Sequence, residues 1–182
     1  MKGLHNKWGQ TRKGEKTMKK ALMLLLLACM LMPMAVYAGP PVDVAGDFTY
    51  LPTGCDEERW ANDIQFVSSC HDTGDWYNGD FEGDSEELYS VAFHGTAEGG
   101  FMEGYEYAFY RGNVTFTGTV HGKSGTLEIL FIGTSPGELD DWNGTWRILS
   151  GTGELANLHG QGVFWATGMG ACHYEGQIHF DP

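Results

Sequence analysis

Apolar and polar residues alternate along three consecutive stretches of the chain, residues 113–122, 125–133 and 141–150. Alternation with a period of two is typical of half-buried β-strands, because side chains at i and i+2 share one face of a sheet. Val, Ile, Phe, Trp and Thr, which favour strands, are frequent in all three stretches. The pattern predicts a three-stranded antiparallel meander with one apolar face and one polar face.

The parity of the apolar positions also predicts a register for this meander. Turns over residues 122–125 and 134–140 would connect the three strands. A slip by one residue would turn the apolar side chains toward water, so opposed residues must share a face. The one charged pair among the expected partners would be an exposed ion pair with a structural role. The expected pairs are Val120–Leu127, Phe116–Phe131, Leu127–Ile148, Ile129–Trp146 and Glu128–Arg147.

Shorter stretches that favour strands lie on both sides of the meander and complete a set of about eight. No stretch has the length and period of a long helix, and 24 glycines follow residue 38. These features predict an all-β fold, an eight-stranded antiparallel β-barrel in a single domain spanning residues 39–182. Residues 52–59 fit a loop, and the acidic residues 71–87 fit an exposed strand and turn. The additional strands are expected over residues 43–51, 61–69, 88–94, 162–166 and 173–180.

The first 38 residues have the order of a secretory signal peptide. Lys19 and Lys20 precede the apolar run 21–32, and small residues end the segment at Ala38. A basic region, an apolar core and a small-residue cleavage site, in that order, are typical of a segment that is removed on export. We therefore expect a mature domain of residues 39–182 that is secreted or periplasmic.

Three alternative interpretations of this segment stay open. A membrane anchor is one, although residues 21–38 are at the lower length limit for a span and Pro33 interrupts them. The sequence LLAC, which ends at Cys29, resembles a lipobox, and a lipid on Cys29 would then anchor the protein. If Met18 is the true start codon, residues 1–17 lie upstream of the protein.

Removal of the first 38 residues leaves a strongly acidic domain. Seven of the eleven Lys and Arg lie in that segment, but only one of the 24 Asp and Glu does. Four basic and 23 acidic residues remain, which gives a formal charge of −19. Such a surface repels nucleic acids and anionic membranes, so we expect neither as a partner, and no membrane span in the mature protein.

Three cysteines follow the signal segment, and an exported chain can form disulfides. Cys55 and Cys70 would close a short loop, and a bond between them would contribute about 3 kcal/mol to stability. Cys172 shares the parity of Tyr174 and Ile178 in the last expected strand. We expect a Cys55–Cys70 disulfide and a buried free thiol at Cys172.

Two short motifs match catalytic or cofactor-binding patterns without their structural context. Residues 133–137 spell G-x-S-x-G, but another strand follows where a nucleophile elbow needs a helix. Residues 151–156 spell G-x-G-x-x-A, but no βαβ unit surrounds them. We therefore assign no catalytic residue and expect no cofactor.

Two groups of residues resemble metal ligands by residue type. Residues 78–83 imitate the start of a calcium-binding loop, but its twelfth position is Tyr89 instead of Glu. His173, Glu175 and His179 share a strand face, where successive side chains lie about 7 Å apart and form no close pair of ligands. An exposed acidic turn and an exposed polar stripe are the favoured interpretations, so we expect no metal site.

Three segments in the C-terminal half of the chain carry a resemblance to a known family. They are HGKSGTLEI (121–129), SGTGELANLHGQG (150–162) and GQIHFDP (176–182). They resemble a family of small domains of unknown function that is related to the allene oxide cyclase-like barrel. The resemblance covers roughly residues 85–182 and implies an eight-stranded barrel of that superfamily. It implies little about activity, because one fold hosts many functions.

Two classes of function fit these observations. The first is a binding module whose aromatic interior holds a small apolar molecule, although the same side chains can instead fill a purely structural barrel. The second is an isomerase or cyclase for a small hydrophobic substrate, which would need polar groups pointing inward, and by parity few do. Association into a homo-oligomer stays open. The expected lining residues are Phe116, Phe131, Trp146, Tyr174 and Phe180.

We predict that export removes residues 1–38, because the basic, apolar and small-residue regions end at Ala38. N-terminal sequencing of the exported protein should then begin at Gly39. A mature protein that begins at a lipid-modified Cys29 would contradict this prediction.

Overall fold

The computed structural model of the protein describes residues 39–137 and 141–182. The segment expected to be a signal peptide lies outside these residues, so its removal stays a prediction. No helix among the described residues is long and apolar enough to cross a membrane.

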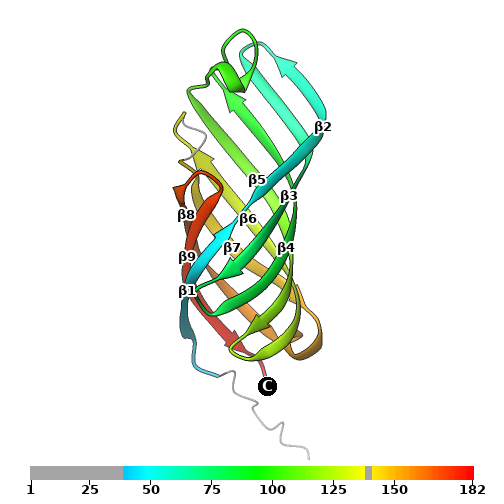
Figure 1. Ribbon diagram of the computed structural model, residues 1–182, viewed down its shortest axis with the longest axis vertical. Coiled ribbons are helices and arrows are strands. Elements are labelled where there is room, and N and C mark those ends of the chain that lie inside the picture. Colours follow the sequence, from blue (N-terminus) through cyan, green and yellow to red (C-terminus); the bar gives the residue numbers. More distant parts are fainter. Residues whose placement is uncertain (1–38, 138–140) are drawn as a thin grey trace, which may run out of the picture. The chain divides into compact units, whose positions relative to one another are not determined.

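The described residues form one antiparallel sheet that closes on itself (Figure 1). Its elements are β1 (Val42–Thr49), β2 (Leu51–Ala61), β3 (Ile64–Tyr77), β4 (Phe81–His94), η1 (Phe101–Glu103), β5 (Tyr107–Val120), β6 (Lys123–Ser135), β7 (Asn143–Gly151), η2 (Gly153–Leu155), β8 (Leu158–Gly168) and β9 (Ala171–Phe180). The strand order is β1-β9-β8-β7-β6-β5-β4-β3-β2, and β1 also pairs with β3. Only Tyr50 separates β1 from β2. Eight strands therefore complete the ring, which confirms the predicted barrel, and β2 continues along β3 beyond it.

The predicted meander corresponds to β5, β6 and β7, and its two faces were predicted correctly. Phe116, Leu127 and Phe131 face the interior and are at most 1% exposed. Glu128 and Arg147, on the opposite face, are exposed. Period-two alternation is therefore a reliable guide to the faces of these strands.

The predicted register between β5 and β6 was wrong by four residues. The turn contains only His121 and Gly122, which have φ values of 50° and 75°. Two positive φ values in a two-residue turn match the twist of a hairpin, and glycine adopts this conformation without strain. An even shift keeps every side chain on its predicted face. The observed pairs in the meander include Phe116–Leu127, Val120–Lys123, Phe131–Trp146, Ile129–Ile148 and Leu130–Arg147.

The register between β6 and β7 was wrong by two residues, so the predicted Glu128–Arg147 ion pair does not form. Arg147 lies opposite Leu130, and Glu128 lies opposite Ser150, beyond an irregularity that leaves Leu149 of β7 unpaired. The Glu128 carboxylate instead accepts a hydrogen bond of 3.0 Å from the Thr115 hydroxyl on β5. β6 ends at Ser135 and β7 begins at Asn143, so the offset of two is already present at Thr134–Asn143, the first pair beside the connection. A register counted from the predicted turn failed because the strands enter the connection at other residues than expected.

The segment 52–59 is part of strand β2, so its prediction as a loop was wrong. All of β2 is exposed, which explains why its sequence shows no alternation of apolar and polar residues. Cys55 lies opposite Cys70 of β3, and the two form a disulfide, as predicted. Cys172 is a buried free thiol, also as predicted.

Aromatic rings fill the closed part of the barrel. Trp76 lies among them, with ring centroids 4.8 Å from Phe48 and 5.1 Å from Tyr174. The indole of Trp146 lies over Gly162 and Gly176, where an added Cβ would come within 2.6 Å and 2.4 Å of it. Glycine at these two positions leaves the space that the Trp146 ring occupies.

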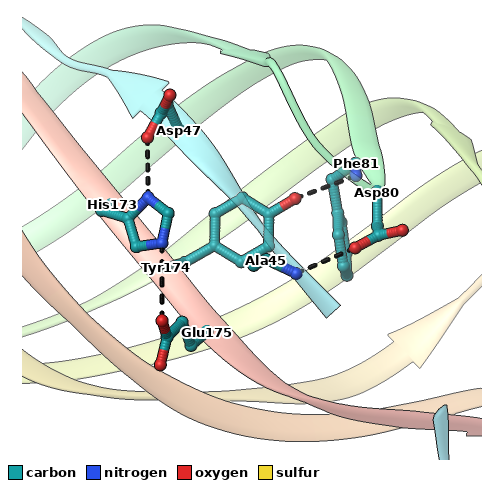
Figure 2. A network of polar contacts seen from close by, with 7 residues as sticks. All are labelled: Ala45, Asp47, Asp80, Phe81, His173, Tyr174 and Glu175. Atoms are coloured by element: carbon teal, nitrogen blue, oxygen red, sulfur yellow. Dashed lines mark hydrogen bonds and ion pairs between the residues drawn. The ribbon is translucent and has the colours of Figure 1, made fainter. Parts of the chain in front are cut away.

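The ring closes at the seam between β1 and β3, where the two strands share only two residue pairs. Figure 2 shows two polar contacts near this seam, between Ala45 and Asp80 and between Phe81 and Tyr174. The Asp80 carboxylate, in the turn after β3, accepts a hydrogen bond of 2.8 Å from the Ala45 backbone N–H. Its other oxygen lies 2.8 Å from Nε2 of His121. The Phe81 N–H donates to the Tyr174 hydroxyl at 2.9 Å, which ties β4 to β9 across the interior.

We predict that Asp80→Ala destabilises the barrel by about 1–3 kcal/mol, because it removes the acceptor of a charge-assisted hydrogen bond at the seam. Chemical denaturation measures the loss. Asp84→Ala is the matched control, since Asp84 is exposed on β4, and it should change stability by at most about 0.5 kcal/mol. Equal effects of the two substitutions would contradict a closing role for Asp80.

A buried carboxylate pair as the candidate functional site

Two carboxyl groups face each other on the inner wall of the barrel. Asp72 on β3 and Glu87 on β4 are directly opposed in the register of these strands. Only 5% of Asp72 and 7% of Glu87 is exposed. The Cβ atoms of opposed residues lie about 5 Å apart, so the two groups share one small volume. We call Asp72 and Glu87 the carboxylate pair and take it as the centre of the candidate site.

A β-bulge in β3 turns Asp72 toward the interior. Gln65 and Val67 face inward at the start of β3, and uninterrupted alternation would point residue 72 outward. The pairing with β4 shifts between Val67 and Cys70, and Ser69 has a φ of 52°. The extra residue of a bulge reverses the parity of the strand after it. Cys70 and Asp72 are buried as a result.

On β4, ordinary alternation is sufficient to place Glu87 inside. Tyr89, Val91 and Phe93 face inward, and Glu87 continues their parity. The adjacent Leu88 is 52% exposed although it is apolar. The aromatic and branched side chains of β4 therefore determine which face of the strand points inward, and Glu87 lies on that face.

The prediction that residues 71–87 form an exposed acidic strand and turn was wrong in part. Asp72, Ser85 and Glu87 are all buried. The expectation that few polar groups point inward was wrong for the same reason. The prediction followed the acidic composition, which is typical of a solvated surface. The alternation of strand 88–94, continued back by one step from Tyr89, would have placed Glu87 on the inner face.

Each member of the carboxylate pair is bound by a tyrosine hydroxyl. Tyr89 donates to Oδ1 of Asp72 and Tyr110 donates to Oε2 of Glu87, both at 2.9 Å. The two tyrosine rings lie 5.1 Å apart and are tilted by 50°. Gly112 lies opposite Tyr89, and an added Cβ there would come within 2.5 Å of the Tyr89 Cβ. A side chain at position 112 would therefore displace Tyr89 from the pair.

Burial makes the carboxylate pair hold its protons more tightly. It raises the pKa of Glu87 to about 7, with a smaller contribution from the charge of Asp72 and an opposing one from the Tyr110 hydrogen bond. Burial also raises the pKa of Asp72, against the hydrogen bond from Tyr89. The pKa values of Tyr89 and Tyr110 are raised as well, first by burial, so both hydroxyls keep their protons. The site can therefore accept and release one proton near neutral pH.

The carboxylate pair lies near the junction of two core clusters. The larger cluster contains the aromatic rings of the closed barrel, and the smaller one lies between the extended ends of β3, β4 and β5. Tyr110 packs against both clusters, and its ring lies 5.8 Å from that of Trp142. Burial, and then the charge of Glu87, raises the pKa of the Cys172 thiol to about 12. Cys172 therefore stays protonated and is a poor nucleophile.

Residues 55–177 match the family model described as a protein of unknown function, DUF3224. The chain belongs to the DUF3224 family. The match confirms the predicted membership in a family of uncharacterised domains. It includes both members of the carboxylate pair and both cysteines of the disulfide. No curated protein matches the chain significantly.

A DUF3224 protein of unknown function from Shewanella oneidensis MR-1, known from a crystal structure at 1.84 Å resolution, has a similar fold. The superposition has a TM-score of 0.59 at 18% sequence identity and covers 79% of this chain and 99% of the other. Similarity at this level of identity extends to the fold alone.

The five residues predicted to line a ligand site lie in or against the larger core cluster of this DUF3224 domain. Phe116, Phe131, Trp146 and Tyr174 are at most 3% exposed, and Phe180 is partly buried. Lys123 covers the Phe180 ring, with Nζ 3.8 Å from its centroid. Ring-to-ring contacts hold the four buried residues, and their role in ligand binding stays a prediction.

The polar stripe on the last strand is divided between two groups of contacts. Nδ1 of His173 lies 2.7 Å from Asp47, and its Nε2 lies 3.8 Å from Glu175 (Figure 2). His179 lies 3.6 Å from Asp181 at the end of the chain. Among the described residues, no three His, Cys, Asp or Glu side chains are arranged to hold a metal ion.

We predict that the carboxylate pair makes this DUF3224 domain less stable as the pH rises. The pKa of Glu87 is about 7 in the folded protein and 4.5 is its ordinary value, so the folded state binds the proton more tightly. The stabilising contribution is fully present below pH 4.5 and is lost as the pH rises through 7. Relative to Glu87→Gln, the wild type should lose about 3 kcal/mol over this interval.

Chemical denaturation at several pH values measures this difference. Glu86→Gln, at the exposed neighbouring position, should show the pH dependence of the wild type. A constant stability difference between wild type and Glu87→Gln from pH 4.5 to 7 would contradict a shared proton at this site.

Proposed function

We propose that this protein is an exported binding module for a small molecule whose polar end is bound by the carboxylate pair. The pair itself carries the proposal. Asp72 and Glu87 are each more than nine-tenths buried and lie opposite each other. Burial of carboxyl groups opposes folding, and a barrel that only had to fold would be more stable with apolar residues at these positions. Titratable groups that are buried at such a cost are typical of functional sites.

The surroundings of the pair supply apolar contacts for such a ligand. Tyr50, Tyr110 and Trp142 are partly buried and pack against the core clusters. Ligand sites in proteins commonly combine aromatic walls with a few converging polar groups. The proposal retains the predicted class of function, a small-molecule binding module, but places recognition at the carboxylate pair and its tyrosines.

A buried donor in the aromatic cluster supports a ligand or water within the barrel. Nε1 of Trp76 is a fully buried donor without a hydrogen-bond partner among the described residues. A buried N–H without an acceptor costs about 1–3 kcal/mol. Trp76 contacts Phe116, Phe131 and Tyr174, which are among the predicted lining residues. A ligand that accepts a hydrogen bond from Trp76 would therefore lie against these rings.

The alternative function is an isomerase or cyclase that moves a proton on a small hydrophobic substrate. Glu87 favours it, because a carboxyl group with a pKa of about 7 can both take and return a proton at neutral pH. Tyr110, at 2.9 Å from Glu87, would orient that carboxyl group. The expected relationship to the allene oxide cyclase-like barrel is proposed together with this enzyme function. Turnover of a bound molecule would distinguish the enzyme from the binding module.

The binding proposal is tested by ligand screening with matched variants. Small acidic, basic and neutral molecules are titrated against the mature protein, with tryptophan fluorescence and thermal unfolding as readouts. We expect at least one class to bind. Its Kd should rise about tenfold or more in Asp72→Asn and Glu87→Gln, because each loses a buried charge-assisted contact, and should not change in Glu86→Gln. No binding by any class, or equal binding by all variants, would contradict the proposal.

A further inference from the structure

We propose that the ligand of the carboxylate pair is a small primary ammonium ion. This inference rests on the binding function proposed above and names the chemical class of its ligand. It depends on the charge of the site, on the carboxylate oxygens that remain available, and on the aromatic rings around them.

The carboxylate pair has no basic partner among the described residues. All four Lys and Arg in this part of the chain are exposed: Arg59, Arg111, Lys123 and Arg147. His71 follows Cys70 in β3 and is exposed on the outer face, from which its charge, when protonated, lowers the pKa of Asp72 only in part against burial. Buried carboxylates are normally paired with a cation or kept neutral by a proton. A cationic ligand would supply the positive charge that the fold lacks at this position.

Each carboxyl group also has an oxygen that no described residue binds. Tyr89 binds Oδ1 of Asp72, and Tyr110 binds Oε2 of Glu87. No other hydrogen bond from the described residues reaches either group. Oδ2 of Asp72 and Oε1 of Glu87 can therefore accept from a bound donor. A primary ammonium group has three N–H donors, enough to bond both oxygens at once.

Aromatic rings beside the pair provide a second contact that favours a cation. The rings of Tyr89 and Tyr110 lie 5.1 Å apart, and that of Trp142 lies 5.8 Å from Tyr110. The faces of Tyr and Trp rings attract cations within about 6 Å, and more strongly where water is excluded. An alkyl chain on the ammonium ion would lie against the same rings.

Binding of a cation should displace the proton that the pair now holds. The other titratable groups around Glu87 are Tyr89, Tyr110 and Cys172, and burial raises the pKa of each above its ordinary value. These three groups keep their protons, and the exposed His71 is the other group whose charge acts on the pair. A proton that is released by the wild type but not by Asp72→Asn or Glu87→Gln therefore comes from the pair. A neutral ligand would release none.

The test compares n-butylammonium with n-butanol, which has the same chain and a neutral end. Binding to the mature protein is followed by tryptophan fluorescence and by the proton released into weakly buffered solution near pH 6.5. We expect n-butylammonium to bind with proton release. Its affinity should fall about 30-fold or more in Asp72→Asn and Glu87→Gln, because each loses one partner of a buried charge pair. Glu86→Gln is the control and should bind as the wild type does.

The outcomes separate this inference from the binding function on which it rests. Equal affinity for n-butanol, binding without proton release, or unchanged affinity in both pair variants would overturn the ammonium ligand. If n-butylammonium fails to bind but another class in the screen binds in a pair-dependent manner, the ammonium inference fails and the binding function stands. Folding of each variant is verified by its cooperative thermal unfolding.

Discussion

The structure depends on the closure of the sheet between β1 and β3. This seam has only two residue pairs, Asp47–Tyr77 and Phe48–Trp76, so side chains must complete it. Phe48 stacks on Trp76 at 4.8 Å on the inside, while Asp80 binds the backbone of β1 at the edge. Without closure the inner face of β3 would be exposed to water, and the pKa of the solvated Asp72 carboxyl group would not be raised. The chemistry of the site therefore follows from the ring.

Strand β3 closes the ring and also contributes Asp72 to the site. It can do so because the residues that face inward change from odd to even numbers once along the strand. The bulge at Ser69 leaves Val67 inside the smaller core cluster and brings Asp72 inside as well. The opposed strand β4 needs no bulge to direct Glu87 inward. One irregular residue thus determines whether the barrel contains one buried carboxyl group or two, and two are needed for a coupled proton.

Sequence alone predicted the barrel and the faces of its regular strands, because alternation in β5, β6, β7 and β9 is strong and survives an even register error. It could not predict the register itself. The two-residue turn at His121–Gly122, and the residues at which β6 ends and β7 begins, depend on backbone conformations that the residue types allow but do not require. The inward position of Glu87 could have been predicted from the sequence, since Glu87 shares the parity of Tyr89. The inward position of Asp72 could not have been predicted, because nothing in the sequence indicates a bulge at Ser69.

The most direct test of this account is the titration of the Glu87 carboxyl group in the folded protein. Carbon-13 NMR of glutamate-labelled protein, with Glu87→Gln to assign the resonance, gives its midpoint. Burial in the closed barrel predicts a midpoint near 7. A midpoint near the ordinary value of 4.5 would mean that the carboxyl group is solvated, and it would contradict a buried carboxylate pair as the centre of the site.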